Sequence, residues 1–194
     1  MKFSKAIEKY LSKFAEPLKL SPPQDRIWRY TLVIPVYGES KSFLENLDKL
    51  PRPSGDLLVL VVLNKPDWAQ NPDPNKELRS AMRDLPISTG SAKNLEIRVV
   101  KDGVDLLIID QEKEYSTFES MNVGKARKIG FDLALAWYCS GVIRSDWISS
   151  TDADAILPPD YFDRIERIHA ETRAICWPLR TLSPRSTASR SLWA

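Results

Sequence analysis

The run Leu57-Leu-Val-Leu-Val-Val-Leu63 is the segment that decides the fold. Consecutive leucine and valine residues predict a strand that is covered on both faces, as strands are in a parallel sheet between layers of helices. No uninterrupted apolar stretch of the chain is longer, and this one is far shorter than the roughly 20 residues that cross a bilayer as a helix. Lysine and glutamate stand near the N-terminus where a signal peptide needs apolar residues, so a cytoplasmic protein is expected.

The neighbouring segments alternate between strand patterns and helix patterns. Tyr30 to Val36 is a β-branched and aromatic run that predicts a strand, and Val123 to Tyr138 has the apolar spacing of a long helix that ends at Gly141. Further strands are predicted at 95–100, 147–150 and 174–177. Residues 106–109 predict either a short strand of their own or an extension of the strand before them. Further helices are predicted at 42–50, 75–85 and 158–172. This alternation predicts an α/β fold whose mostly parallel sheet is flanked by helices in a Rossmann-like arrangement.

Composition excludes several classes of protein. The 194 residues carry 28 Lys+Arg and 26 Asp+Glu, a net charge of +2. Proteins that bind nucleic acid usually show a marked basic excess, so no nucleic-acid partner is expected. Cys139 and Cys176 stand alone in apolar segments, which predicts buried free thiols in place of a disulfide framework or a zinc site.

The sequence divides into four segments. Residues 1–16 place Ile7 and Leu11 at helical spacing with lysines on the other faces, which predicts a basic amphipathic helix. Such a helix either docks on the domain or lies on an anionic membrane as a peripheral contact. The proline-containing residues 17–29 predict a linker, 30–177 the α/β domain, and 178–194 an irregular tail rich in Ser and Arg. That tail is either a disordered terminus or the mark of a lost continuation.

Asp152-Ala-Asp154 is the sharpest candidate for chemistry. Two carboxylates directly after a predicted strand lie at the carboxyl edge of the sheet, where open α/β sheets bind their ligands. Hard oxygen ligands suit Mg²⁺ or Mn²⁺, which can bridge the phosphates of a nucleotide. An acidic pair of this kind also occurs as a solvated turn or a helix cap. The apolar strand before it and the Leu157-Pro-Pro-Asp160 helix start after it favour the functional interpretation.

Two further segments carry side chains suited to a nucleotide. Thr31-Leu-Val-Ile-Pro-Val-Tyr-Gly-Glu39 ends in an aromatic ring, Tyr37, and a carboxylate, Glu39, which can stack on a base and accept a hydrogen bond from it. The alternative is a turn with a capping glutamate. Gly124-Lys-Ala-Arg-Lys128 places basic residues in the first turns of a helix, whose N-terminus already favours anions. The alternative here is a solvated basic face.

Together and in this order, the three segments resemble the nucleotide-sugar-binding half of the family 2 glycosyltransferases with the GT-A fold, over about residues 30–172. The resemblance implies an enzyme that transfers a sugar from a nucleoside diphosphate-sugar, first of all a UDP-sugar, to an acceptor such as a glycan or a lipid-linked molecule, with Mg²⁺ or Mn²⁺. The implied residues are Pro35, Tyr37 and Glu39 at the base, Lys125 and Arg127 at the base or diphosphate, Asp152 near the ribose and the metal, and Asp154 as the direct metal ligand.

The sequence departs from this family at two places. Asn64 follows the second strand, where the family usually has an Asp that contacts the base, so a base contact by Asn64 is the corresponding expectation. No Asp or Glu follows Glu171, although the resemblance implies a second half with a general base. The catalytic base therefore stays unassigned. Two functions remain open: an active transferase, alone or completed by another chain, and a truncated, inactive remnant that binds the donor.

Other enzyme classes match less of the chain. Asp152-Ala-Asp-Ala-Ile156 also fits the start of the haloacid-dehalogenase-like phosphatases, but that motif normally follows the first strand. A sugar nucleotidyltransferase would carry a glycine-rich N-terminal loop, which this sequence lacks. The single histidine, His169, lies in a predicted amphipathic helix with no nucleophile elbow nearby, which argues against a Ser/His/Asp hydrolase.

Overall fold

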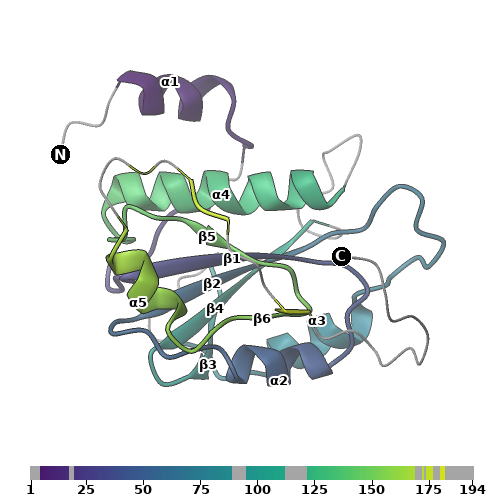
Figure 1. Ribbon diagram of the computed structural model, residues 1–194. Helices are drawn as coiled ribbons and strands as arrows, with labels where there is room; N and C mark the ends of the chain where they lie inside the picture. The colour runs from purple at the N-terminus through teal and green to yellow at the C-terminus, as the bar shows by residue number, and fades with distance from the viewer. Residues whose placement is uncertain are drawn as a thin grey trace, which may run out of the picture.

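A five-stranded sheet between two layers of helices forms the body of the computed structural model (Figure 1). The structure describes residues 5–17, 20–88, 95–111, 122–168, 172, 174–176 and 180–181. The helices are α1 (Lys5–Lys13), α2 (Ser42–Asp48), α3 (Lys76–Arg83), α4 (Val123–Ser140) and α5 (Tyr161–Glu166), and the strands are β1 (Tyr30–Val36), β2 (Leu57–Leu63), β3 (Ile97–Lys101), β4 (Val104–Asp110), β5 (Ser149–Ser150), β6 (Ala155–Ile156) and β7 (Arg180–Thr181).

The strand order of the main sheet is β3-β4-β2-β1-β5. Strands β4, β2, β1 and β5 run parallel, and β3 is antiparallel to β4. This confirms the predicted α/β class with a mostly parallel sheet. The predicted short strand at 106–109 is in fact the seven-residue β4, which pairs with β2 from Leu57↔Val104 to Leu63↔Asp110.

The chain fills one side of the sheet before it crosses to the other. From β1 it moves to β2 and on to the edge strand β3, returns inward as β4, and α4 then carries it to β5 on the other side of β1. The carboxyl ends of β1 and β5 therefore lie next to each other at a topological switch point. In open α/β sheets such a reversal leaves a crevice in which ligands bind.

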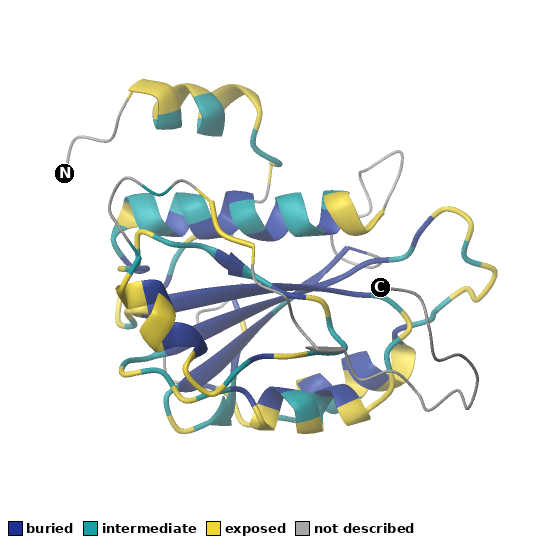
Figure 2. Ribbon diagram, viewed as in Figure 1, coloured by how far each residue is buried: buried dark blue, intermediate teal, exposed yellow. Residues whose placement is uncertain are grey.

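Each face of the sheet packs against its own layer of helices. Ile34 and Leu47 belong to the core on the α2, α3 and α5 face, and Val33 and Ile129 to the core on the α4 face. Helix α4 approaches β1 closely at Gly130, where an added Cβ would lie 2.3 Å from Val33 Cγ1. This close approach fixes the helix that carries the predicted basic residues. Figure 2 shows the buried strands between the two layers.

The β5 side of the sheet is less regular than predicted. The predicted strand at 147–150 is reduced to Ser149–Ser150. Ser145 donates its backbone N–H to Arg29 O at 2.9 Å, and Thr151 to Val33 O at 3.1 Å, so the chain leaves β1 between these contacts. Helix α5 ends at Glu166, earlier than the predicted 172.

The predicted strand at 174–177 is wrong for residues 174–176, which lie in no strand, and Trp177 is outside the described residues. A small two-stranded sheet pairs Ala155–Ile156 with Arg180–Thr181. The second of these strands lies within the segment predicted as an irregular tail. The rest of that tail lies outside the described residues. The predicted burial of both thiols is also wrong, because Cys139 is half-buried and Cys176 is exposed.

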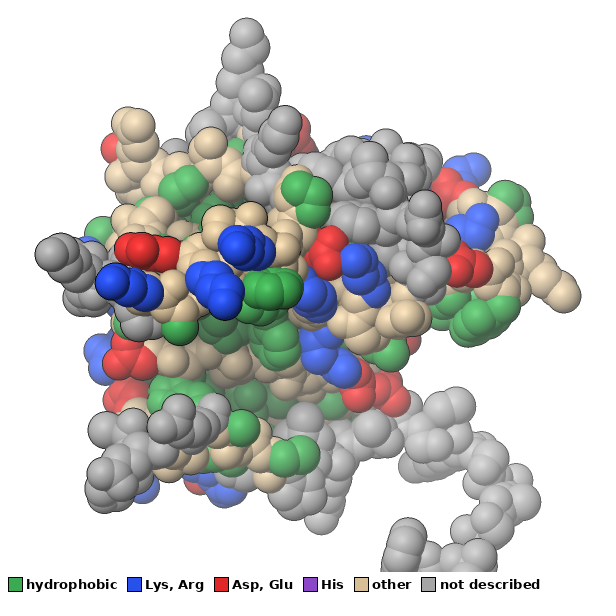
Figure 3. Space-filling model, turned by 90° about the horizontal axis from the view of Figure 1, so that it is seen from above, with side chains coloured by type: hydrophobic (Ala, Val, Ile, Leu, Met, Phe, Trp, Pro, Cys, Tyr) green, Lys and Arg blue, Asp and Glu red, His purple; other side chains and the backbone are tan. Residues whose placement is uncertain are grey.

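Helix α1 and the turn after it contact α4. The Tyr10 hydroxyl donates to Asp132 Oδ1 at 2.7 Å, and the Glu16 backbone N–H donates to Asp132 Oδ2 at 2.9 Å. These contacts favour the docked interpretation of the predicted amphipathic helix. Lysine and arginine side chains gather on the face that carries this helix (Figure 3). Among the described residues, no helix has the length and apolar character needed to span a membrane.

Candidate functional site

Two loops meet at the switch point of the sheet. The loop after β1 carries Tyr37 and Glu39, and the loop after β5 carries Asp152 and Asp154. These loops lie side by side because β1 and β5 pair in parallel, with Val33 opposite Ser150. The sequence placed these side chains at one edge of the sheet, and the topology brings the two segments together although more than 100 residues separate them.

The carboxylates of Glu39 and Asp154 lie near enough to repel each other. Burial raises the pKa of Glu39, and the negative charge of Asp154 raises it further. Both side chains are half-buried. A divalent cation between or beside these carboxylates would remove the repulsion, and carboxylate oxygens are the ligands that Mg²⁺ and Mn²⁺ prefer.

Asp152 lies against Arg127 of α4. The guanidinium Nη2 donates to Asp152 Oδ1, and its Nε donates to Ser150 Oγ at 3.1 Å. Ser150 Oγ in turn donates to Val33 O at 3.0 Å. The arginine is thus held over the end of β5, and one oxygen of Asp152 is engaged with a cation of the protein itself.

Pro35, Tyr37 and Asn64 line a small cavity of about 260 Å³. The Tyr37 ring meets Trp68 edge to face, with the ring centroids 5.4 Å apart. The remaining lining residues are Pro66, Trp68, Asn122 and Val123. Sequence reasoning missed these four. The available signal was a tryptophan within a proline-rich loop, because a ring outside any strand or helix pattern is not expected to fill the core.

Asn64 is buried and ties the loops at this edge together. Its side-chain Nδ2 donates to Val36 O at 3.1 Å, and its backbone carbonyl oxygen accepts a hydrogen bond from Asn75 Nδ2 at 2.9 Å. Asn75 Oδ1 accepts in turn from Gly38 N at 2.8 Å. Gly38 has φ +64°, a conformation that favours glycine. The amide network of Asn64 and Asn75 therefore shapes the turn that presents Tyr37 and Glu39.

Lys125 is not brought to the crevice. Its ammonium lies 2.5 Å from Glu16 Oε1, on the side of α4 that contacts the segment after α1. Lys128 Nζ is also close to Glu16 Oε1, at 3.3 Å. Arg127 is therefore the member of the basic helical segment that the structure joins to the acidic loop.

The described residues contain no group of three or more His, Cys, Asp or Glu side chains close enough to hold a metal ion. Asp154 with Glu39 offers two carboxylates of the right chemistry for Mg²⁺ or Mn²⁺. A cation held there would need further oxygen ligands, such as water or the phosphates of a nucleotide, which is usual for Mg²⁺.

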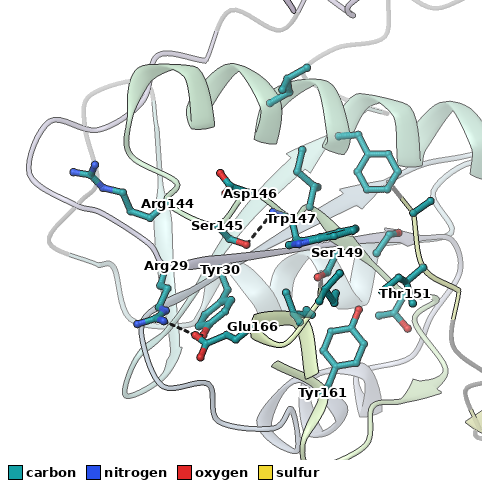
Figure 4. Close-up of a pocket in the computed structure, with 18 of the residues that line it drawn as sticks. Arg29, Tyr30, Arg144, Ser145, Asp146, Trp147, Ser149, Thr151, Tyr161 and Glu166 are labelled. Carbon is teal, nitrogen blue, oxygen red and sulfur yellow. Dashed lines mark hydrogen bonds and ion pairs between the residues drawn. The ribbon is translucent and has the colours of Figure 1, made fainter. Parts of the chain in front are cut away.

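A second and much larger cavity, a groove of about 1800 Å³, runs along the outer side of β5 (Figure 4). Its walls include Phe131 and Leu135 of α4 and Tyr161 and Ile165 of α5, with Trp147 between them. One end of the groove reaches Arg127 and Asp152, so it opens beside the acidic loop.

A comparison of the chain with protein-family models, curated proteins and solved structures finds no match.

Proposed function

We propose that this chain binds a nucleoside diphosphate-sugar, with Mg²⁺ or Mn²⁺, and acts as the donor-binding domain of a glycosyltransferase with a GT-A-like fold. The observation that carries the proposal is the pairing of β1 with β5 at the strand reversal, which places the loop of Glu39 beside the loop of Asp154, next to the pair formed by Arg127 and Asp152. Acidic and basic groups in one crevice suit a ligand made of phosphates and a divalent cation.

The cavity beside this crevice suits the base of the nucleotide. Tyr37 offers an aromatic ring, Pro35 an apolar wall and Asn64 an amide, and the described side chains that line the cavity carry no charge. A neutral heterocycle fits such a lining better than a charged group does. Tyr37 and Glu39 are two residues apart, so one loop would contact the base at one end and the diphosphate region at the other.

Asp154 would hold the metal together with oxygens of the diphosphate, and Asp152 would face the ribose side of the donor. The metal would supply positive charge that neutralises the leaving diphosphate. The Arg127 guanidinium would add a second positive charge at the same place. It would contact the diphosphate either after leaving Asp152 or while still paired with it. Lys125 could contribute only after leaving Glu16.

Transfer to an acceptor also needs a general base, and we assign none to this chain. Donor binding and sugar transfer are therefore separate questions. Acceptor-dependent consumption of the donor would demonstrate an active transferase, whereas donor binding without consumption would fit the donor-binding remnant.

Calorimetric titration of UDP into the chain tests the proposal, with Mn²⁺ and then with EDTA. Binding that requires the metal is expected. Asp154→Asn should lower the affinity in Mn²⁺ at least about tenfold, because it removes the charge that holds the cation. The matched control is Asp163→Asn, which changes an exposed carboxylate on α5 and should bind as the unchanged chain does.

Equal affinities for UDP in Mn²⁺ and in EDTA would contradict the metal assignment. An absence of binding for UDP and also for GDP would contradict the nucleotide assignment as a whole.

A further inference from the structure

Helix α1 is held on the outside of α4 by polar groups. The Tyr10 hydroxyl and the Glu16 backbone N–H both donate to the Asp132 carboxylate. Lys128 Nζ donates to Phe14 O at 2.7 Å. None of the nine residues of α1 is buried, and Figure 1 shows the helix as a layer of its own beyond α4. The docking of α1 therefore rests on hydrogen bonds and ion pairs in place of a packed apolar interface.

One side of the helix carries apolar side chains that are incompletely covered. Ile7, Leu11 and Phe14 recur at intervals of four and three residues, so they lie on one side of the helical turns. Phe14 N donates to Tyr10 O at 2.8 Å, which continues the turn beyond the end of α1. Ile7 and Leu11 are half-buried, and Phe14 is 58% exposed. Among the described residues, the side chains that pack against either core of the main sheet do not include Leu11 or Phe14.

The opposite side of the helix is positively charged. Lys5, Lys9 and Lys13 are each four residues apart and are all exposed. Glu8 is the one acidic residue of the helix. Figure 3 shows basic side chains gathered on the face that carries α1. A helix with an apolar side and a lysine-rich opposite side is typical of helices that lie in the interface of an anionic membrane.

We propose that α1 binds an anionic membrane surface, with Leu11 and Phe14 inserted between the lipids and the lysines among the lipid phosphates. Positive charge favours this partner, because anionic lipids attract lysine and a neutral lipid surface does not. Tyr10 lies on the same side of the helix as the apolar residues and contacts Asp132, so α1 leaves α4 when it inserts. Asp132 then keeps its ion pair with Lys128. This proposal is independent of donor binding, which uses the crevice at the strand ends.

Co-sedimentation of the whole chain with phospholipid vesicles tests the proposal. Vesicles made of equal parts of phosphatidylglycerol and phosphatidylcholine should bind the chain at least about tenfold more strongly than vesicles of phosphatidylcholine alone. The difference should become smaller as salt is added, because salt screens the attraction between lysine and lipid.

Substitution of the charged side tests which surface binds. The combined change Lys5→Gln, Lys9→Gln and Lys13→Gln should weaken binding to the anionic vesicles at least about tenfold. The matched control removes the same charge at exposed positions of the opposite helical layer, and it should bind as the unchanged chain does. Its positions, at the ends of α2 and the start of α3, are Lys41, Lys49 and Lys76.

Two further variants test insertion and release. Phe14→Gln keeps the charge and should weaken binding at least about fivefold, because an apolar ring no longer enters the lipid. Ile87→Gln, at an equally exposed apolar position of the β3 edge, should not alter it. Asp132→Asn loosens the docking and should strengthen binding at least about threefold. Asp163→Asn removes the same charge from α5 and should have no effect. Circular dichroism verifies that each variant is folded.

Several results would overturn the proposal: no preference for the anionic vesicles, equal binding of the three-lysine variant and its control, or unchanged or weaker binding of Asp132→Asn. Loss of binding in the three-lysine variant but not in Phe14→Gln would mean that the docked helix contacts lipid through its lysines alone, which contradicts insertion. Self-association of the chain without lipid, abolished by Phe14→Gln, would assign the apolar side to a second copy and would also overturn the proposal.

Discussion

Two arginine–aspartate pairs lie at the carboxyl edge of the sheet, and their surroundings differ. Arg79 of α3 pairs with Asp110 at the end of β4, with side chains that are 4% and 0% exposed. Arg127 of α4 pairs with Asp152 after β5, with side chains that are 33% and 62% exposed. The first pair is enclosed by the protein. The second is open to solvent, so a ligand can exchange with either partner.

This difference separates stability from binding at the same edge. A buried ion pair cannot lose one partner without leaving a charge in an apolar surrounding, whereas an exposed pair contributes little to stability because water screens it. The β4 side of the edge is thus built as a fixed support. The β1–β5 side is the part that can respond to a ligand.

The largest expected effect comes from breaking the buried pair. Asp110→Ala removes one carboxylate from the buried Arg79 guanidinium and leaves its ion pair with Asp73, and it should lower the free energy of unfolding by about 3–5 kcal/mol. Asp152→Ala should change it by less than about 1 kcal/mol. Chemical denaturation of both variants measures the comparison, and equal losses would contradict the distinction between the two pairs.

The next effect concerns the open pair. Arg127→Gln should leave the unfolding free energy almost unchanged and weaken UDP binding by about 1.5–3 kcal/mol, because a charged hydrogen bond to the diphosphate is lost. Calorimetry in Mn²⁺ measures the affinity. The control is Arg164→Gln, which removes an exposed arginine of α5 that pairs with Asp160. Equal affinities of Arg127→Gln and the control would place the diphosphate elsewhere.

A similar or smaller loss of UDP affinity is expected from a change in the small uncharged cavity beside the β1–β5 crevice. Tyr37→Ala removes the ring from the small cavity and should weaken UDP binding by about 1–3 kcal/mol, the range for stacking of a base on an aromatic side chain. Tyr37→Phe keeps the ring and should retain most of the affinity. If the two variants bound UDP alike and as tightly as the unchanged chain, the cavity would not be the base site.

The sequence predicted the parts of the fold that rest on local pattern. Leu57–Leu63 forms β2 with the expected bounds, because an unbroken apolar run is typical of a strand covered on both faces. The extent of β4 was missed because Asp105 interrupts its apolar pattern. Asp105 is buried and accepts hydrogen bonds from Arg26 Nε and Trp28 Nε1, both at 2.8 Å. Partners so far away in the sequence cannot be recognised from the pattern around Asp105.

The same limit applies to the candidate site. Helical spacing places Lys125 and Arg127 in the first turns of α4, but it does not tell which of them faces the strand ends. That depends on the packing of α4 and on Glu16, which attracts Lys125 to the other side. Trp68 was missed for a related reason, since its contact with Tyr37 joins two loops that no local pattern connects.

The smallest expected effect concerns pH and the acidic side of the crevice. Burial and the charge of Asp154 raise the pKa of Glu39 in the folded chain. Between its ordinary pKa and this raised pKa the folded state binds more protons than the unfolded state, so the Glu39 contribution to stability decreases as pH rises through that window. Glu39→Gln should therefore be more stable than the unchanged chain at neutral pH, by less than about 1 kcal/mol.

This advantage should disappear below the ordinary pKa of a glutamate, where Glu39 is protonated in both states. Chemical denaturation across the acidic to neutral range measures it, with Glu45→Gln, an exposed change on α2, as the matched control. Addition of Mn²⁺ at neutral pH should stabilise the unchanged chain more than Glu39→Gln, because the cation relieves a repulsion that the variant no longer has. If both chains gained equally, Asp154 would bind the metal without Glu39, and the acidic side of the crevice would consist of Asp154 and the donor phosphates alone.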